Sequence, residues 1–184
     1  MSDDLLEVIQ SEIAGVLAGL ERAQLDSAVT ELDSAPRAFT AGAGRSGFMA
    51  SAFAMRLVHL GLQTHVVGEA TAPATGTDDV LVAVSGSGTT GSTVRAAEEA
   101  TAAGGRVVAV TTDADSSLAR LAHSVVAIPA ATKHRRDDEA TTVQPLSSLF
   151  DQCVHLVLDA VCLDLAHRRA IDNAAAKHRH VNGE

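Results

Sequence analysis

The spacing of apolar residues predicts a long helix at the start of the chain. Leu5, Ile9, Ile13 and Leu17 recur every four residues, which places their side chains on one face of a helix. Acidic residues just before this run suit the positive end of a helix dipole. We therefore expect an N-terminal amphipathic helix over about residues 3–30.

Short apolar runs then alternate with helical patterns. The runs at residues 78–85 and 106–112 are almost continuously apolar, as is typical of strands covered on both faces in a parallel sheet. Further strand-like runs lie at residues 37–41, 64–68 and 124–130, and helical patterns cover residues 46–60 and 90–103. The alternation predicts an α/β core over residues 37–130. Its five parallel strands would have helices on both faces, a doubly wound arrangement of the flavodoxin or Rossmann type.

The chain after this core divides into three parts. Residues 131–144 are polar and contain the charge run KHRRDDEA, which suits either a solvated loop or a lid over a site. An apolar-faced pattern then predicts a C-terminal helix over residues 145–169. Residues 170–184 have no clear pattern and are expected to form a tail. We expect residues 1–184 to form a single domain.

Composition and charge narrow the possible partners. The 184 residues are 46% hydrophobic, which suits a folded domain rather than a disordered chain. The net charge of −9 argues against nucleic acid or an acidic membrane as a partner. A small anionic ligand remains compatible, because helix N-termini bind anions locally. With no apolar signal-peptide core and no run of about 20 apolar residues, a cytoplasmic location is expected.

The first of two glycine-rich loops carries an ambiguous motif. The stretch AGAGRSGF contains Gly42, Gly44 and Gly47 at the G-x-G-x-x-G spacing of dinucleotide-binding proteins. Glu69 lies about where such proteins carry the acid that binds the ribose. The same spacing also suits a tight strand-to-helix turn that holds no cofactor. This loop alone leaves both interpretations open.

The second loop, SGSGTTGST, is rich in hydroxyl groups. A helix N-cap accounts for one or two of its serines and threonines, but not for all of them. Hydroxyl and backbone N–H donors beside a helix N-terminus suit the three acceptor oxygens of a phosphate monoester. We therefore predict a phosphate-monoester site at these two loops, with Gly44, Arg45 and Ser46 as candidate contacts from the first loop. The predicted phosphate loop consists of Ser85, Gly86, Ser87, Gly88, Thr89 and Thr90.

This second loop resembles the phosphate loop of the sugar isomerase (SIS) domain family, whose pattern is roughly S-x-S-G-x-T. The stretches GAGRSG, AMRLVHLG, VVGEATAP, QPLSSLFDQ and KHRHVN are similar to one group within that family, the 6-phospho-3-hexuloisomerases. The resemblance extends over about residues 3–182. It implies a SIS domain with a five-stranded parallel sheet, assembled as a homotetramer with sites at subunit interfaces.

The resemblance also implies an activity. Enzymes of this group interconvert D-arabino-hex-3-ulose 6-phosphate and D-fructose 6-phosphate through an enediol, as part of the ribulose monophosphate pathway. They require no metal and no cofactor, so none is expected here.

Particular residues receive roles through the resemblance. The family usually has glutamate after SLF, where this chain has Asp151, one methylene shorter and the candidate catalytic base. His59 and His180 match family histidines and are candidates to assist the proton transfer, while Gln152 and Glu69 are candidates to contact the sugar. Each position also has a plain alternative: a helix N-terminal acid for Asp151, a helix-end histidine for His59 and a disordered tail around His180.

Other functions remain compatible with the sequence. A SIS isomerase acting on arabinose 5-phosphate and a non-catalytic sugar-phosphate sensor would both keep the phosphate loop. A nicotinamide-binding domain would keep the first loop. Cys153 and Cys162 lie nine residues apart in one helical pattern. They would face opposite sides of that helix, so we expect two reduced core residues.

Overall fold

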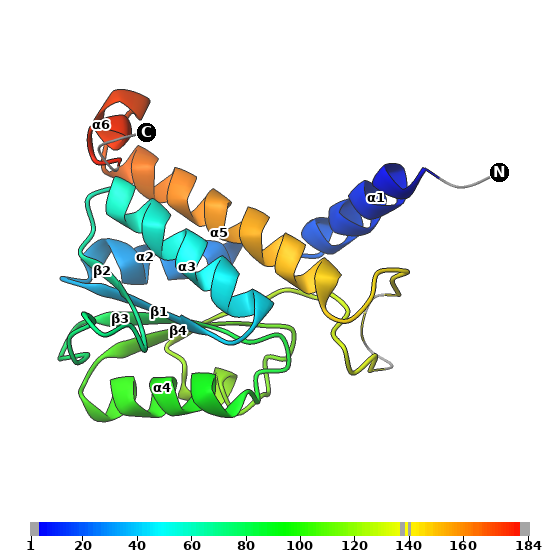
Figure 1. Cartoon of the computed structure of the whole chain (residues 1–184), viewed down its shortest axis with the longest axis horizontal. Helices are drawn as coiled ribbons and strands as arrows, with labels where there is room; N and C mark the ends of the chain where they lie inside the picture. The colour runs from blue at the N-terminus through cyan, green and yellow to red at the C-terminus, as the bar shows by residue number, and fades with distance from the viewer. Residues whose placement is uncertain (1–3, 137–138, 140, 181–184) are drawn as a thin grey trace.

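The computed structural model describes residues 4–136, 139 and 141–180, and it is built around one parallel sheet (Figure 1). The strand order is β2-β1-β3-β4-β5, and every neighbouring pair is parallel. The strands are β1 (Ala38–Gly42), β2 (Thr64–Val66), β3 (Val80–Val84), β4 (Arg106–Thr111) and β5 (Ser124–Ala127). The strand order reverses between β1 and β3, so the connections that follow these two strands lie on opposite faces of the sheet.

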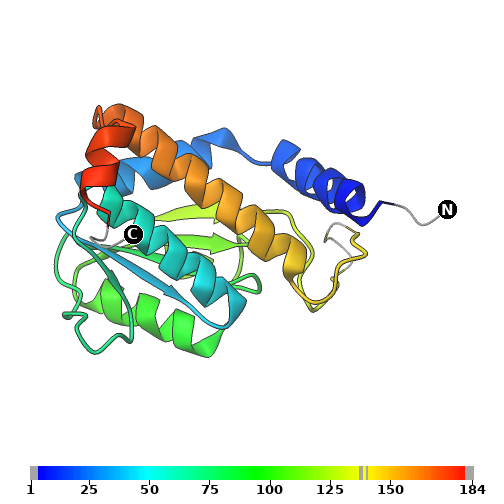
Figure 2. The same cartoon turned by 45° about the horizontal axis from the view of Figure 1, so that its top comes forward.

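Helices cover both faces of the sheet. On one face lie α2 (Arg22–Ser34), α3 (Arg45–His59) and α5 (Ser148–Arg168). On the other face lie α4 (Gly91–Ala102) and a short 3-10 helix, Ala119–Leu121 (Figures 1 and 2). The predicted doubly wound α/β fold is confirmed.

The central strand β3 explains why its sequence is continuously apolar. Val80, Val82 and Val84 belong to the larger core cluster beneath α3 and α5. Leu81 and Ala83 point to the opposite face and pack beneath α4. Since both faces of the strand are covered, neither set of side chains can be polar without leaving polar groups in the core.

The two cysteines lie in the larger core cluster. Cys153 and Cys162 are buried on α5 and are not bonded to each other. Burial raises the pKa of the Cys153 thiol to about 11 and, with a contribution from Asp159, that of Cys162 to about 12. Both thiols are therefore protonated at neutral pH and serve as packing groups. Within the described residues, no helix is long and apolar enough to cross a membrane.

The single helix predicted over residues 3–30 is wrong. The segment forms two helices, α1 (Leu5–Ala18) and α2, separated at Gly19 and Leu20. Gly19 is the C-cap of α1, and glycine stabilises a helix interior poorly. Leu20 is only 8% exposed, so the chain bends where this side chain enters the core. As a result α2 packs on the sheet, while α1 extends away from it beside the start of α5 (Figures 1 and 2).

The C-terminal region also differs from expectation. The predicted helix over residues 145–169 is observed as α5, but the tail predicted at residues 170–184 contains a further helix, α6 (Asn173–His178). The Asp172 carboxylate caps this helix by accepting a hydrogen bond from the Ala175 N–H at 2.8 Å. The sequence reasoning overlooked this cap before the alanine-rich stretch. Residues 181–184 of the predicted tail lie outside the described residues.

Candidate functional site

The two glycine-rich loops meet at the crossover of the sheet. The first loop joins β1 to α3, and the second joins the adjacent strand β3 to α4 on the opposite face (Figure 2). Ligands of open α/β sheets bind at such a switch point, outside the carboxyl ends of the strands. A cavity of about 240 Å³ lies here.

Five parts of the chain line this cavity, which we call the loop cavity. They are the two glycine-rich loops, the start of α5, and both ends of the long segment between β5 and α5. The lining residues are Ala43, Arg45, Ser46, Val84, Ser85, Gly86, Ser87, Thr90, Thr132, Lys133, His134, Leu146, Ser147 and Asp151. The structure thus brings Arg45 and Ser46 together with the candidate base Asp151 and with much of the predicted phosphate loop.

Three glycines give the first loop its shape. Gly44 precedes α3 with φ 59° and ψ −134°, a conformation that essentially only glycine adopts. A Cβ atom on Gly42 would lie 2.9 Å from the Gly47 backbone nitrogen, and one on Gly47 would lie 2.9 Å from the Gly42 carbonyl oxygen. The spacing G-x-G-x-x-G therefore lets the end of β1 touch the first turn of α3.

The second loop is shaped by close packing and holds its hydroxyl groups together. A Cβ atom on Gly88, where φ is 62°, would lie 2.1 Å from the Ser116 hydroxyl oxygen. The hydroxyl oxygens of Ser85 and Thr90 lie 2.8 Å apart and share a hydrogen bond. Thr90 is the N-cap of α4 but makes no side-chain cap bond. The N-terminus of α4 can therefore offer N–H groups and a partial positive charge to an anion.

Asp151 is the buried acid of the loop cavity. It lies in the first turn of α5 and is 3% exposed. Its Oδ1 accepts a hydrogen bond from the Ser46 hydroxyl at 2.8 Å, and its Oδ2 lies 3.5 Å from Arg45 Nε. Burial raises the pKa of the Asp151 carboxyl, outweighing Ser46 and Arg45, which both lower it. A carboxyl group with a raised pKa in a polar cavity is suited to accept a proton from a ligand.

The Arg45 side chain contacts two residues at the start of α5. Its Nη1 donates a hydrogen bond to the Ser148 hydroxyl at 2.8 Å, while its Nε faces Asp151. The Arg45 side chain is 55% exposed, so it contacts α5 and also reaches solvent.

Several predicted site residues lie elsewhere. Gly44, Gly88 and Thr89 belong to the two loops but do not line the loop cavity. Gln152 follows Asp151 yet does not line it either; its buried amide oxygen has no hydrogen-bond partner among the described residues. Glu69 is exposed beyond β2 and lines a separate cavity of about 450 Å³.

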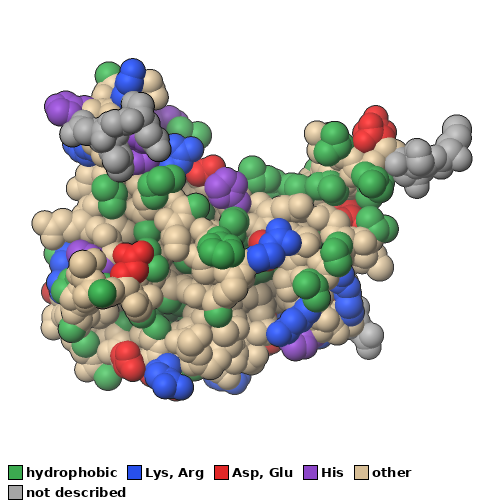
Figure 3. All heavy atoms as spheres, in the orientation of Figure 1, with side chains coloured by type: hydrophobic (Ala, Val, Ile, Leu, Met, Phe, Trp, Pro, Cys, Tyr) green, Lys and Arg blue, Asp and Glu red, His purple; other side chains and the backbone are tan. Residues whose placement is uncertain are grey.

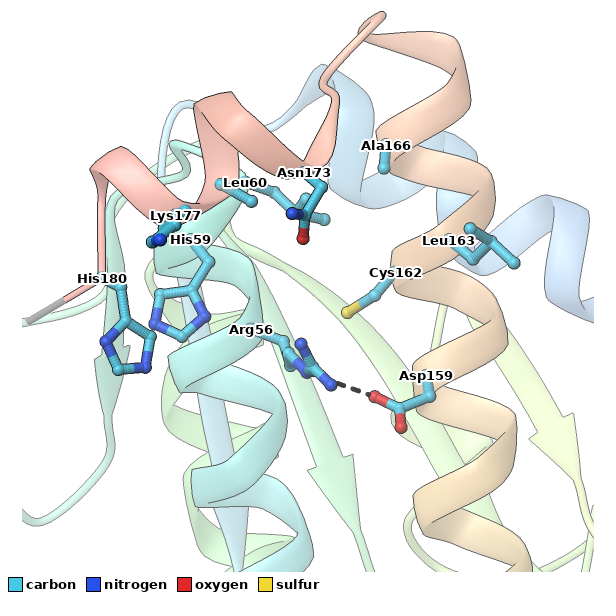
Figure 4. A pocket seen from close by; sticks show the side chains of 11 residues that line it. Arg56, His59, Leu60, Asp159, Cys162, Leu163, Ala166, Asn173, Lys177 and His180 are labelled. Carbon is cyan, nitrogen blue, oxygen red and sulfur yellow. Dashed lines mark ion pairs between the residues drawn. The ribbon is translucent and has the colours of Figure 1, made fainter. Parts of the chain in front are cut away.

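The two candidate histidines lie together in a third cavity. It has a volume of about 510 Å³ and lies between α3, α5 and α6 (Figure 4). The rings of His59 and His180 face each other with their centroids 4.9 Å apart. Burial lowers the pKa of His59, and His180 and Arg56 lower it further. His59 is therefore held toward its neutral form, able to donate one hydrogen bond and accept another.

These histidines are remote from the loop cavity of the same chain. Ser46 lies at the start of α3 and His59 at its end, which at 1.5 Å per residue separates them by about 20 Å along the helix. A small sugar phosphate in contact with Asp151 therefore cannot reach His59 of the same chain. The structure separates the predicted catalytic residues into two groups.

The sequence reasoning missed one wall of the loop cavity. Thr132, Lys133, His134, Leu146 and Ser147 line it from the segment before α5. The available signal was the charge run KHRR, which the lid interpretation would have placed over a site. Among the described residues, no cluster of three or more histidine, cysteine, aspartate or glutamate side chains could hold a metal ion.

The fold and the site define a class: an α/β protein with a donor-rich site and a buried carboxyl at the switch point of a parallel sheet. A match to the SIS domain family covers residues 31–160. The chain belongs to the SIS domain family.

Relatives of nearly equal length match this chain from end to end. A 3-hexulose-6-phosphate isomerase of Mycobacterium gastri is 39% identical over 187 residues, covering 100% of this chain and 94% of the relative. One of Bacillus subtilis is 36% identical over 176 residues, covering 96% and 95%. A crystal structure from Methanococcus jannaschii, described as inferring a 3-hexulose-6-phosphate isomerase function, has a TM-score of 0.84 at 26% identity. That match covers 98% of this chain and 99% of the other.

Proposed function

We propose that this protein is a sugar-phosphate isomerase that interconverts D-arabino-hex-3-ulose 6-phosphate and D-fructose 6-phosphate. The observation that carries the proposal is the buried Asp151 carboxyl, with its raised pKa, in the same cavity as the hydroxyl-rich loop before α4. Full-length relatives named 3-hexulose-6-phosphate isomerase support this choice among sugar phosphates.

The proposed reaction moves one proton between adjacent carbons. The phosphate binds the hydroxyls of Ser85, Ser87 and Thr90 and the N-terminus of α4, which fixes the far end of the sugar. Asp151 takes the proton from C2 of the hexulose, the electrons of that bond form the C2–C3 double bond, and the π electrons of the C3 carbonyl move to O3 to give an enediolate. Asp151 then returns the proton to C3 while a proton passes from O2 to O3, leaving the carbonyl at C2.

Ser46 and Arg45 hold the base in place. The hydrogen bond from Ser46 and the nearby guanidinium of Arg45 fix both oxygens of Asp151. Both contacts favour the ionised form that accepts the proton, while burial keeps the pKa high enough for the proton to be returned. Gly44, Gly86, Gly88, Thr89, Gln152 and Glu69 remain predicted substrate contacts.

The proposal places His59 and His180 at the site of a neighbouring subunit. The separation along α3 prevents them from acting on a sugar beside Asp151 of their own chain. In a homotetramer with sites at subunit interfaces, neutral His59 could relay the proton between O2 and O3 of a sugar held by the neighbour. This assembly and both histidine roles are part of the proposal.

An exposed apolar face supports association. Hydrophobic side chains are visible on the surface over α3 and α5 (Figure 3). Phe48 is 71% exposed, and Met55, Leu156 and Leu163 on the same two helices are also exposed. Such a face is costly to leave in water and is typical of an interface between subunits.

A coupled assay tests the proposed reaction. Formaldehyde and ribulose 5-phosphate are condensed by a hexulose-phosphate synthase, and fructose 6-phosphate formation is followed after adding this protein. No fructose 6-phosphate at high protein concentration would contradict the proposal. Turnover of arabinose 5-phosphate instead would indicate another SIS isomerase, and thermal stabilisation by sugar phosphates without any turnover would indicate a sensor. A role in the ribulose monophosphate pathway, a cytoplasmic location and a single domain over residues 1–184 remain predictions.

A further inference from the structure

The segment between β5 and α5 returns to the loop cavity at both ends. Its described residues from position 131 onward, 131–136, 139 and 141–147, are called the strap here. Thr132, Lys133 and His134 line the cavity from the first end, and Leu146 and Ser147 line it from the second. The ends are joined because the Lys133 N–H donates a hydrogen bond to the Ser147 hydroxyl at 3.0 Å.

Contacts within the strap fix the backbone beside Lys133. The Glu139 carboxylate accepts hydrogen bonds from the Thr132 N–H at 2.8 Å and from the Thr132 hydroxyl at 2.6 Å. The Arg135 guanidinium donates to the carbonyl oxygens of Thr132 and Gln144, one on each side of the strap. These bonds hold the backbone around Lys133, an exposed residue that lines the cavity.

Glu12 of α1 binds the second end of the strap, just before Leu146 and Ser147. Its carboxylate accepts hydrogen bonds from the Thr142 hydroxyl at 2.7 Å, the Val143 N–H at 2.8 Å and Gln144 Nε2 at 2.9 Å. Burial raises the pKa of Glu12, but these bonds and the positive charge of Arg135 together lower it below the ordinary value. The helix that extends away from the sheet thus supplies a charged anchor for a wall of the cavity.

The charges of the loop cavity leave one cation without an anion. Asp151 neutralises Arg45, which lies 3.5 Å away. Among the described residues, no carboxylate lies within ion-pair distance of the Lys133 ammonium. A sugar phosphate carries a charge of about −1.5 to −2 at neutral pH. The helix dipole and hydroxyl groups offset only part of that charge, so a full positive charge at the cavity would stabilise the bound ligand.

We propose that Lys133 binds the phosphate group of the substrate and that Glu12 is a positioning residue, which holds the strap where Lys133 reaches the cavity. The inference rests on the proposed function, since it concerns the phosphate of the same sugar. It adds a phosphate-binding residue from outside the glycine-rich loops, and it links substrate binding to α1.

The first experiment compares Lys133→Gln with Arg22→Gln in the isomerase assay. Arg22 is an exposed residue at the start of α2 that does not line the loop cavity, so the control removes the same charge elsewhere. For Lys133→Gln, KM for fructose 6-phosphate should rise about 10- to 100-fold, the effect of losing a hydrogen bond to a charged group. The inhibition constant of inorganic phosphate should rise similarly, while kcat changes by less than about threefold because Lys133 does not contact the reacting carbons. Lys133→Arg should retain most of the affinity.

The second experiment tests Glu12 through a double-mutant cycle. Glu12→Gln should raise KM and leave kcat nearly unchanged, because one acceptor oxygen is lost and the strap loosens. In the Lys133→Gln background, Glu12→Gln should have almost no further effect on KM, since the residue through which it acts is gone. A merely structural role for Glu12 would lower stability and activity equally in both backgrounds.

The outcomes separate this inference from the proposed function. If the wild type isomerises the sugar but Lys133→Gln has the KM and phosphate inhibition of Arg22→Gln, the inference is overturned and the proposed function stands. If the wild type shows no isomerisation, the proposed function fails. Calorimetric binding of inorganic phosphate to the wild type and to Lys133→Gln then tests the role of Lys133 on its own, and equal affinities would overturn it.

Discussion

The two ends of the helix pair α3 and α5 carry different titratable groups. The helices lie side by side and run in the same direction (Figure 1). At their N-terminal ends, Asp151 lies beside Ser46 and Arg45 in the loop cavity. At their C-terminal ends, His59 and His180 lie in the larger cavity that also contains Asp159 and Cys162 (Figure 4). One end thus presents a candidate acid–base carboxyl, and the other presents candidate imidazoles.

Burial opposes the helix dipole at both ends. The dipole favours an anion at a helix N-terminus and a cation at a C-terminus. Yet the pKa of Asp151 is raised and that of His59 is lowered, with burial as the largest cause in each case. Burial therefore favours the protonated, neutral carboxyl at one end and the unprotonated, neutral imidazole at the other. Each end of the helix pair thus holds a titratable group shifted toward its neutral form, and the length of α3 keeps the two groups apart.

Replacing the acid should produce the largest effect. In Asp151→Asn we expect kcat to fall by about 10²- to 10⁴-fold, the contribution of general acid–base catalysis. Affinity for fructose 6-phosphate, measured by calorimetry, should remain within about threefold because the asparagine keeps an oxygen that can accept from Ser46. A comparable loss of affinity would instead indicate that Asp151 shapes the site. Asp151→Glu, which matches the residue usual in the family, tests whether the shorter side chain limits the rate.

Mixing two inactive variants should show whether the two ends meet between subunits. Asp151→Asn and His59→Asn chains, each nearly inactive alone, are unfolded together and refolded. Subunits that share sites should then regain about a quarter of wild-type activity, because half of the pairs are mixed and each mixed pair has one intact site. Absence of recovery, with mixed oligomers demonstrated by mass spectrometry, would place each complete site in one chain.

Removing a loop hydroxyl should give a smaller effect, confined to the N-terminal end. Thr90→Val keeps the shape of the side chain but loses the hydroxyl that pairs with Ser85. We expect KM to rise about 10-fold with kcat nearly unchanged, because the phosphate loses one donor in both ground and transition states. Thr101→Val makes the same change at the far end of α4 and serves as the control. Equal kinetic parameters for the two variants would remove Thr90 from the phosphate site.

The smallest expected effect concerns stability. Because the folded pKa of Asp151 is raised, the folded chain binds more protons than the unfolded chain above about pH 3.8. The free energy of unfolding should therefore decrease as pH rises through this window and stay lower at neutral pH. Asp151→Asn should then unfold at a higher temperature than the wild type at pH 7, by about 2–4 °C for each kcal/mol. This advantage should vanish in acid. A lower Tm at pH 7 would mean that the contact with Arg45 outweighs the cost of burial.

Local patterns predicted the fold and part of the site. The continuous apolar run of β3 required cover on both faces, and the parallel sheet followed from it. Loops at the ends of adjacent parallel strands had to share one edge, so Ser46 and Ser85 could be expected near each other. The contact of Ser46 with Asp151 spans 105 positions of sequence. Asp151 was predicted as a site residue through the family resemblance, because no local pattern connects it to the first loop.

The features that the sequence did not predict depend on how residues far apart in the chain pack against one another. The periodic pattern of α1 continued past Gly19, and only the packing of Leu20 in the core decides that the helix ends there. His59 matched a family motif, but the length of α3 separates it from Asp151 of its own chain. Lys133 belongs to a charge run that has no periodicity, and its place at the cavity comes from bonds made by its neighbours along the strap.

The contact between Gly42 and Gly47 has a consequence for how sequence motifs are interpreted. Neither position tolerates a Cβ atom, because the end of β1 touches the first turn of α3 there. The pattern G-x-G-x-x-G is therefore a requirement of backbone approach, which chains with different ligands can satisfy in the same way. A search that equates this spacing with a nicotinamide cofactor will include phosphosugar proteins. Two other features distinguish phosphosugar proteins better: the hydroxyl content of the loop after the adjacent strand, and a buried carboxyl in the same cavity.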